Sequence, residues 1–164
     1  MPFQSTINNN IGFGVVGELF LDGPLRVQPG RLDSADAANN VFGRAFTIKD
    51  DATASFETSD DPQPLDVQAG QTGRFAGILC NPKTHPHWGT LAGGSLAASL
   101  ILPNNTIAEF VQETAGLIVA LPAAFAIGDW VYFTNATGVL TSALPGMANA
   151  PASSTRIPGS HVVR

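Results

Sequence analysis

Short runs of apolar and β-branched residues, separated by glycine and proline, recur along the chain. Residues 130–134 (Trp-Val-Tyr-Phe-Thr) have the most strand-like composition, because aromatic and β-branched side chains favour β structure. The turn at 127–129 precedes this run. The loop Asn135-Ala136-Thr137-Gly138 follows it, with glycine where a left-handed residue is needed. With a returning strand over 139–141, the pattern predicts a hairpin from Gly128 to Thr141.

Other segments of the chain have the same short-strand pattern. Strands are predicted at 15–21, 41–49, 65–68, 74–80, 106–113, 117–121 and 156–164, and residues 95–102 fit either a strand or a short helix. Residues 31–40 are polar and alanine-rich, which indicates a loop or one helical turn. In the second strand Phe42, Phe46 and Ile48 share one face. Arg44 lies on the same face, so we expect Arg44 at an edge or a partner surface.

This count of about eight to ten short strands with almost no helix predicts an all-β fold. We expect a single jelly-roll-like domain, or a small open barrel or sandwich, because 164 residues suit one domain. Residues 1–12 are mostly polar and carry no periodic pattern, which predicts an extended N-terminal arm. Residues 13–164 form the predicted β-rich domain.

The composition narrows the possible partners. Charged residues make up only 13% of the chain, and a surface so poor in charge suits burial against neighbouring proteins. The net charge is −5 and the eight basic residues are scattered, so the concentrated positive face that nucleic acid requires is not predicted. The apolar runs at 96–102 and 117–127 are too short, or too interrupted by proline, to cross a bilayer. The N-terminus lacks the pattern of a signal peptide, so we expect cytoplasmic synthesis.

Two motifs suggest cofactor or metal binding, and in each the context argues against it. Residues 12–17 spell Gly-x-Gly-x-x-Gly, but a polar segment precedes them and Asp22-Gly23-Pro24 follows, where a dinucleotide site needs a strand and then a helix. His85, His87 and His161 could supply imidazole ligands, but zinc needs three or four ligands on a rigid frame. We therefore predict neither a cofactor nor a metal ion.

The acidic and nucleophilic residues also lack a catalytic context. The pairs Asp50-Asp51 and Asp60-Asp61 lie in a proline-containing loop, which favours solvated carboxylates. The only cysteine, Cys80, lies in an apolar run and is expected to be an inert core thiol. No Gly-x-Ser-x-Gly occurs, and we predict no catalytic residue.

The aromatic residues leave two interpretations open. Phe125, Trp130, Tyr132 and Phe133 could form a platform for a sugar ring, or they could form core with one cross-strand pair. A carbohydrate- or receptor-binding domain that uses Trp88, Trp130 or Tyr132 is therefore an alternative to a purely structural role. A metal-dependent hydrolase built on His85, His87 and Asp carboxylates is a third hypothesis.

The segment from Gly116 to Leu140 resembles a stretch found in capsid cement, or decoration, proteins of tailed bacteriophages. In that family a strand ending in Leu-Pro leads through a loop of small residues into Gly-Asp-x-Val-Tyr, and a turn containing Thr-Gly follows. Residues 41–46 (Val-Phe-Gly-Arg-Ala-Phe), 74–77 (Arg-Phe-Ala-Gly) and 102–109 (Leu-Pro-Asn-Asn-Thr-Ile-Ala-Glu) resemble further pieces in the same order. The resemblance covers roughly residues 41–145.

This resemblance implies a structural virion protein without enzymatic activity. It would bind the outer surface of the major capsid protein shell and bridge adjacent capsomers, as a homo-dimer or homo-trimer at local symmetry axes. From the sequence we expect the contacts in the N-terminal segment and in the irregular loop 81–94. The candidate contact residues are Pro2, Phe3, Ile7, Ile11, Phe13, His85, His87 and Trp88.

Overall fold

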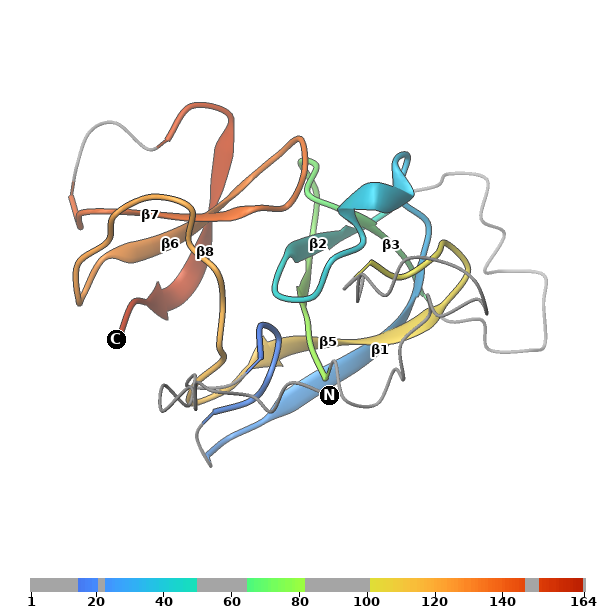
Figure 1. The fold of residues 1–164 in the computed structure, drawn as a ribbon, viewed down its shortest axis with the longest axis horizontal. Helices are drawn as coiled ribbons and strands as arrows, with labels where there is room; N and C mark the ends of the chain where they lie inside the picture. The colour runs from blue at the N-terminus through green and yellow to red at the C-terminus, as the bar shows by residue number, and fades with distance from the viewer. Residues whose placement is uncertain (1–14, 21–22, 50–64, 82–100, 147–150, 164) are drawn as a thin grey trace, which may run out of the picture.

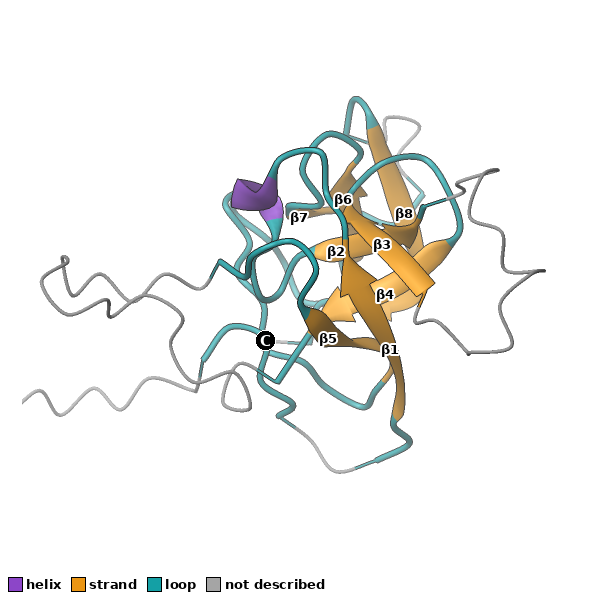
Figure 2. Cartoon of the chain, turned by 90° about the vertical axis from the view of Figure 1, so that its right-hand side faces the viewer, coloured by secondary structure: helices purple, strands orange, loops and turns teal. Residues whose placement is uncertain are grey.

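The computed structural model describes residues 15–20, 23–49, 65–81, 101–146 and 151–163. The described residues form a β-barrel and a separate sheet beside it (Figure 1). Figure 2 shows strands joined by long loops in the described residues, with one short helical turn. The elements are β1 Arg26–Leu32, η1 Ala37–Asn39, β2 Ala45–Ile48, β3 Leu65–Ala69, β4 Phe75–Leu79, β5 Ile107–Glu113, β6 Trp130–Thr134, β7 Leu140–Ala143 and β8 Ser154–His161.

The barrel closes in the order β1-β3-β2-β4-β5, with β5 paired to β1. All neighbouring strands are antiparallel except β1 and β3, which are parallel. Its interior is filled by large apolar side chains, among which the rings of Phe46 and Phe110 lie 5.1 Å apart. Phe42 and Phe46 belong to this core and Ile48 packs against it, as their shared face predicts.

The second sheet has the order β7-β6-β8 and is called here the C-terminal sheet. Its inner face carries Val131, Phe133, Leu140, Ile157 and Val162, all of them buried. These side chains form a second core together with Ala45, Phe75 and Ile78 of the barrel strands β2 and β4. The C-terminal sheet is therefore packed on the outside of the barrel wall.

Backbone hydrogen bonds join the two sheets at one point. The loop between β6 and β7 meets the barrel at Ala45, whose N–H donates to the carbonyl of Gly138 at 2.9 Å. The carbonyl of Ala45 accepts from Gly70 at 3.0 Å, and the N–H of Gln71 donates to the carbonyl of Asn135 at 2.5 Å. Gly138 has φ +71° and lies so close that a Cβ there would be 2.2 Å from the Ala45 oxygen. The glycine predicted for the loop is thus needed for both its backbone angle and this approach.

The all-β prediction is confirmed, and the hairpin of β6 and β7 lies where it was predicted. The arrangement differs, because the barrel is closed rather than open and a second sheet packs outside it. The predicted arm and residues 82–100 lie outside the described residues. Two predicted strands are not formed in the described residues, those over 15–20 and 117–121. These segments are joined instead by one isolated β-bridge, between Leu19 and Leu117.

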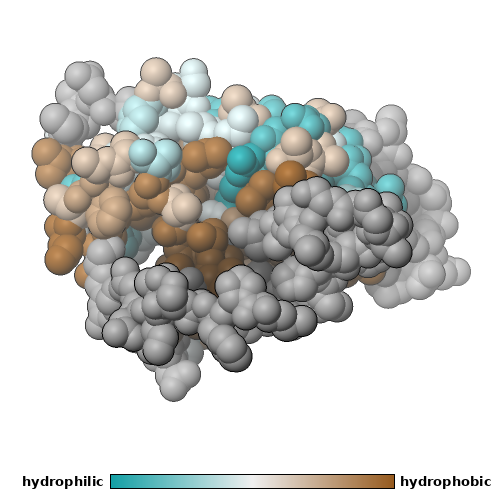
Figure 3. All heavy atoms as spheres, in the orientation of Figure 1, coloured by the Kyte–Doolittle hydropathy of each residue, from teal (hydrophilic) through white to brown (hydrophobic). Residues whose placement is uncertain are grey.

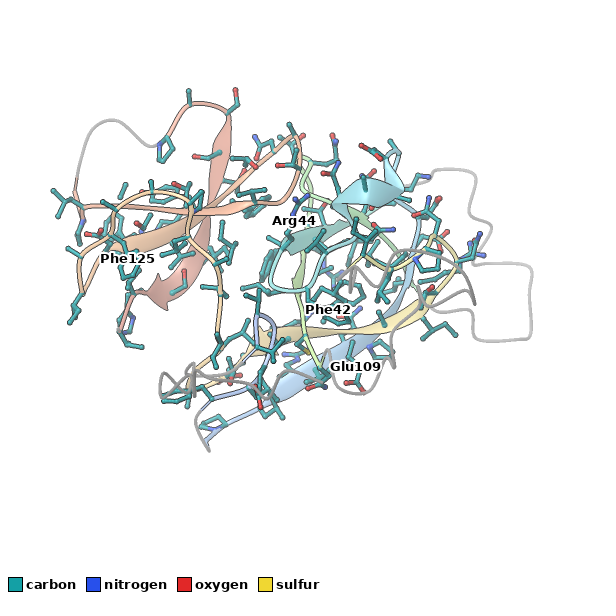
Figure 4. All side chains as sticks on the ribbon, viewed as in Figure 1. Phe42, Arg44, Glu109 and Phe125 are labelled. Carbon is teal, nitrogen blue, oxygen red and sulfur yellow. The ribbon has the colours of Figure 1, made fainter. Side chains whose placement is uncertain are left out.

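Strand β1 was not predicted, because Pro29 and Gly30 interrupt its sequence. Arg44, expected at an edge or a partner surface, lies half-buried just before β2 and makes polar contacts within the chain. Its guanidinium donates to Asn39 Oδ1 at 2.6 Å and to the carbonyl of Thr137 at 3.4 Å, and burial lowers its pKa. Arg44 therefore links the barrel to the β6–β7 loop (Figure 4).

Candidate functional site: the contact surfaces

Charge is distributed unevenly between the two parts of the molecule. Residues 1–113, which include all five barrel strands, contain six Lys or Arg and twelve Asp or Glu, a formal charge of −6. Residues 114–164 contain Asp129, Arg156 and Arg164 as their only charged side chains, a formal charge of +1. In Figure 3, hydrophilic residues gather mainly over the barrel and hydrophobic ones toward the C-terminal sheet. Among the described residues both parts are close to neutral: residues 15–113 carry six acidic and five basic side chains there, and residues 114–163 carry Asp129 and Arg156.

Exposed hydrophobic side chains collect at one end of the C-terminal sheet. Ile127 is 78% exposed, Leu144 53%, and Phe125 and Val163 49% each. They come together because β6 starts where β7 and β8 end, and Trp130 pairs with both Ala143 and His161. We call these four residues the hydrophobic end. Figure 4 shows Phe125 there, on the loop that leads into β6.

The turn before β6 holds this end in place. Asp129 Oδ2 accepts the N–H of Ala126 at 2.8 Å, and the Asp129 N–H donates to the carbonyl of Ala126 at 3.1 Å. Gly128, with φ +91°, donates to the carbonyl of Val162 at 2.8 Å, which ties the loop to the end of β8. Only 6% of Asp129 is exposed, and its Oδ1 is buried without a hydrogen-bond partner among the described residues. The Gly-Asp pair is therefore a structural turn, and each residue of the loop 122–128 before it is exposed.

A cavity of about 460 Å³ lies between the barrel and the C-terminal sheet. Its walls are mostly apolar and include Phe75, Val111, Leu117, Val119 and Ile157, with His161 among the polar residues. The segment 15–20 passes beside it, because Gly17 and Phe20 donate backbone hydrogen bonds to the carbonyls of Ile118 and Gly116. Figure 3 shows hydrophobic atoms in the hollow between the two parts.

The opposite side of the barrel is polar and internally paired. Arg31 binds the Asp66 carboxylate through two hydrogen bonds of 2.6 and 2.7 Å, and this contact raises the pKa of Arg31. Lys49 pairs with Asp33 nearby. Because their charges are neutralised within the chain, these ion pairs indicate a solvated, structural surface.

The residues considered for catalysis and metal binding do not come together in the described part of the chain. His161 is exposed on β8, and no group of three or more His, Cys, Asp or Glu side chains gathers among the described residues. Gly17 is the last glycine of the Gly-x-Gly-x-x-Gly motif. It lies in a turn and the described residues 18–20 after it are not helical, whereas a dinucleotide site needs a helix there. Cys80 is buried, and burial together with the nearby Glu109 raises the pKa of its thiol to about 11. A thiol with this pKa is protonated at neutral pH and is a poor nucleophile.

The aromatic residues form core rather than a sugar platform. Tyr132 and Phe133 are buried, and the Phe133 ring lies 6.1 Å from Phe75 of the barrel. The guanidinium of Arg156 lies 3.5 Å from the centre of the Trp130 ring and covers it. Of the four aromatic residues predicted as a possible platform, Phe125 alone is exposed. A stacking surface for a sugar is thus not present in this cluster.

The eight predicted contact residues (Pro2, Phe3, Ile7, Ile11, Phe13, His85, His87 and Trp88) lie outside the described residues. Sequence reasoning missed the hydrophobic end. One signal could have found it: Phe125 and Ile127 lie in a short segment without charged residues that is bounded by Pro122 and Gly128, and residues that favour turns place such a segment in a surface loop.

An all-β fold with exposed hydrophobic side chains at one end of the C-terminal sheet suits a structural protein that acts by forming contacts. One further finding is more specific. A family model described as structural cement protein (E217 gp24/Pam3 gp6) matches residues 3–164. The chain therefore belongs to this family of phage structural cement proteins. No curated protein matches the chain, and no helix among the described residues is long and apolar enough to span a bilayer.

Proposed function

We propose that this protein binds the outer surface of the major capsid protein shell and bridges adjacent capsomers, as a homo-dimer or homo-trimer at local symmetry axes. The match to the structural cement family over residues 3–164 carries the proposal. The low charge of residues 114–164 supports it, because such a surface is suited to burial against other proteins. In this role the protein has no catalytic activity, cofactor, nucleic-acid partner or membrane partner. It is made in the host cytoplasm and resides on the virion.

Reinforcement of the shell follows from multivalency. Each contact need bury only a modest surface, because a protein that holds two capsomers at once dissociates only when both contacts break. The N-terminal arm, residues 1–12, is proposed as one contact, through Pro2, Phe3, Ile7 and Ile11, with Phe13 beside it. An extended arm can add to a neighbouring sheet edge through main-chain hydrogen bonds. The loop with His85, His87 and Trp88 is proposed as the second contact.

The test is binding to shells assembled from the major capsid protein of the same phage without this protein. We expect the full chain to co-sediment with the shells and to raise the temperature at which they break open. Deletion of residues 1–12 should abolish co-sedimentation while the far-ultraviolet circular dichroism spectrum is retained. A variant with His85, His87 and Trp88 changed to serine tests the loop separately.

Three results would each contradict one part of the proposal. If the full chain does not bind the shells at any concentration, the cement function is wrong for this protein. If it binds and the deletion binds equally well, the function stands and the arm is not the contact. Density for the bound protein away from the junctions between capsomers would contradict bridging.

A further inference from the structure

The segment 15–20, called here the strap, is bonded along its length to the connection between β5 and β6 (Figure 1, where the strap is blue). The two segments run antiparallel, as the bridge between Leu19 and Leu117 shows. Three backbone hydrogen bonds of 2.8 to 2.9 Å join them and are called here the strap ladder: Gly17 N–H to the Ile118 carbonyl, Ile118 N–H to the Glu18 carbonyl, and Phe20 N–H to the Gly116 carbonyl.

The residues that the strap holds are also a wall of the cavity between the barrel and the C-terminal sheet. Gly116, Leu117 and Val119 line this space of about 460 Å³. Well-packed protein interiors contain few voids larger than a water molecule, so the barrel, the sheet and their connection are not close-packed here. The wall at 116–118 can therefore move without first disrupting a packed core.

The strap itself is held by few buried contacts. Gly17 is its one buried residue, whereas Val15 is 41% exposed and Phe20 37%. The strap contributes no residue to either of the two cores described above. Segments with few buried apolar contacts open at a lower free energy than the core of the same protein. The strap ladder is thus weaker than the barrel to which it is attached.

Gly17 fixes the strap on its barrel side. Its carbonyl accepts the N–H of Asn81 at 3.0 Å, and its φ is +88°. A Cβ there would lie 3.0 Å from Phe42 Cβ and 3.2 Å from the Leu79 carbonyl oxygen. The position therefore requires glycine, which gives the last glycine of the Gly-x-Gly-x-x-Gly motif a structural role.

We infer that the strap is a latch, which releases residues 116–118 and binds them again while the barrel and the second core stay folded. Release frees one wall of the cavity, whereas Val119 and Leu121 still pack against the second core. This exchange is a property of the isolated protein.

One consequence rests on the proposed function. The strap continues directly from residues 1–14, which include the proposed arm. A shell contact of the arm that favours one state of the strap would shift the cavity wall toward that state, because binding to one of two conformations shifts their populations.

The experiment is native-state hydrogen exchange of the isolated full chain, followed by NMR in rising, sub-denaturing urea. The reporters are the strap-ladder amides of Ile118 and Phe20. The core amides of Leu32 and Cys80, which donate to the carbonyls of Thr106 and Glu109, serve for comparison. We expect protection factors at least about tenfold lower for the strap ladder than for the core amides. Their dependence on urea should also be weaker, because a local opening exposes little surface.

Two glycine substitutions separate the strap from the rest of the fold. Gly17→Ala should lower the protection of Ile118 and Phe20 by about tenfold or more, because a left-handed residue with a side chain is strained and the strap then leaves the barrel more easily. Gly146→Ala is the matched control, with φ +77° and open space in the described residues around its Cβ position. It strains the latched and released states alike, so strap-ladder protection should stay within about twofold of the natural chain.

Circular dichroism establishes that the variants are folded, and the urea dependence of the natural chain decides the question if Gly17→Ala is not. The inference is overturned if Ile118 and Phe20 share the protection and urea dependence of Leu32 and Cys80, because the strap then opens only on global unfolding. It is also overturned if Phe20 alone loses protection, since the strap then frays at one end, or if Gly146→Ala acts as strongly as Gly17→Ala. Failure of shell binding would leave these results unaffected.

Discussion

At the scale of single residues, the junction between barrel and C-terminal sheet depends on Gly138. Replacement by alanine adds a Cβ 2.2 Å from the Ala45 carbonyl oxygen, at a residue with φ +71°. We expect Gly138→Ala to lower the free energy of unfolding by more than about 2 kcal/mol, since left-handed backbone alone costs an L-residue roughly 1–2 kcal/mol. Chemical denaturation followed by tryptophan fluorescence measures the change.

Gly146 is the matched control for this substitution. It has a similar backbone angle, φ +77°, but no atom of the described residues lies within 4 Å of the Cβ position. Gly146→Ala should therefore lose only the cost of the left-handed backbone, about 1–2 kcal/mol. Equal losses for the two variants would mean that the close approach at Ala45 does not contribute.

Cys80 predicts a pH dependence of stability. Its thiol pKa is raised from the ordinary value of 9.0 to about 11, mainly by burial and also by Glu109. The folded state therefore binds this proton more tightly than the unfolded state. The contribution to stability is fully present below pH 9 and is lost as the pH rises from about 9 to about 11.

The measurement is the free energy of unfolding of the natural chain and of Cys80→Ala at a series of pH values from 8 to 11. Other groups titrate in this range in both proteins, so the difference between the two isolates the thiol. We expect the natural chain to lose more stability than Cys80→Ala over this range. Parallel curves would show that Cys80 titrates alike in the folded and unfolded states.

At the scale of elements, the attachment of β6 to the barrel rests on Phe133. Its side chain is 1% exposed and packs on Phe75 of β4. We expect Phe133→Ala to lower the free energy of unfolding by about 3–5 kcal/mol, as for other buried phenylalanines. Phe125→Ala, at the exposed hydrophobic end, should change it by less than about 0.5 kcal/mol in the monomer. Thermal or chemical unfolding at low protein concentration compares them, and similar losses would contradict the assignment of Phe133 to the second core.

The sequence predicted those elements whose local pattern matches their environment. Strands β2, β3, β4, β5 and β6 were found because their apolar and β-branched residues cluster between turn residues. Residues 117–121 have the same composition but belong to the connection between β5 and β6, where Val119 and Leu121 pack against the second core. Composition cannot separate a strand from a linker that is buried by tertiary contact.

The candidate contact surface was beyond local reasoning for a different reason. Phe125, Leu144 and Val163 are far apart in the sequence and meet only because β6 starts where β7 and β8 end. Exposure of an apolar residue is also a property of the fold, since Ile127 and Ile157 have the same side chain and opposite burial. The family resemblance gave the class of protein, but strand pairing was needed to place this surface.

At the scale of the whole molecule, the proposed shell contacts and the hydrophobic end lie in different parts of the sequence, within residues 1–113 and residues 114–164 respectively. The predicted arm and loop belong in sequence to the barrel part, residues 1–113. Each oligomer would then present several such contacts to the shell, which is the arrangement that multivalent binding requires.

The order of the elements along the chain also has a consequence during synthesis. All five barrel strands lie between residues 26 and 113, so the whole barrel has left the ribosome before β8 has been made. Until residues 130–161 follow, the C-terminal sheet that covers Phe75 and Ile78 in the folded protein does not exist. These two side chains then lie on an uncovered outer wall of the barrel. A nascent chain stopped after β5 would therefore expose an apolar face, the kind of surface that chaperones bind and that aggregates when translation is incomplete.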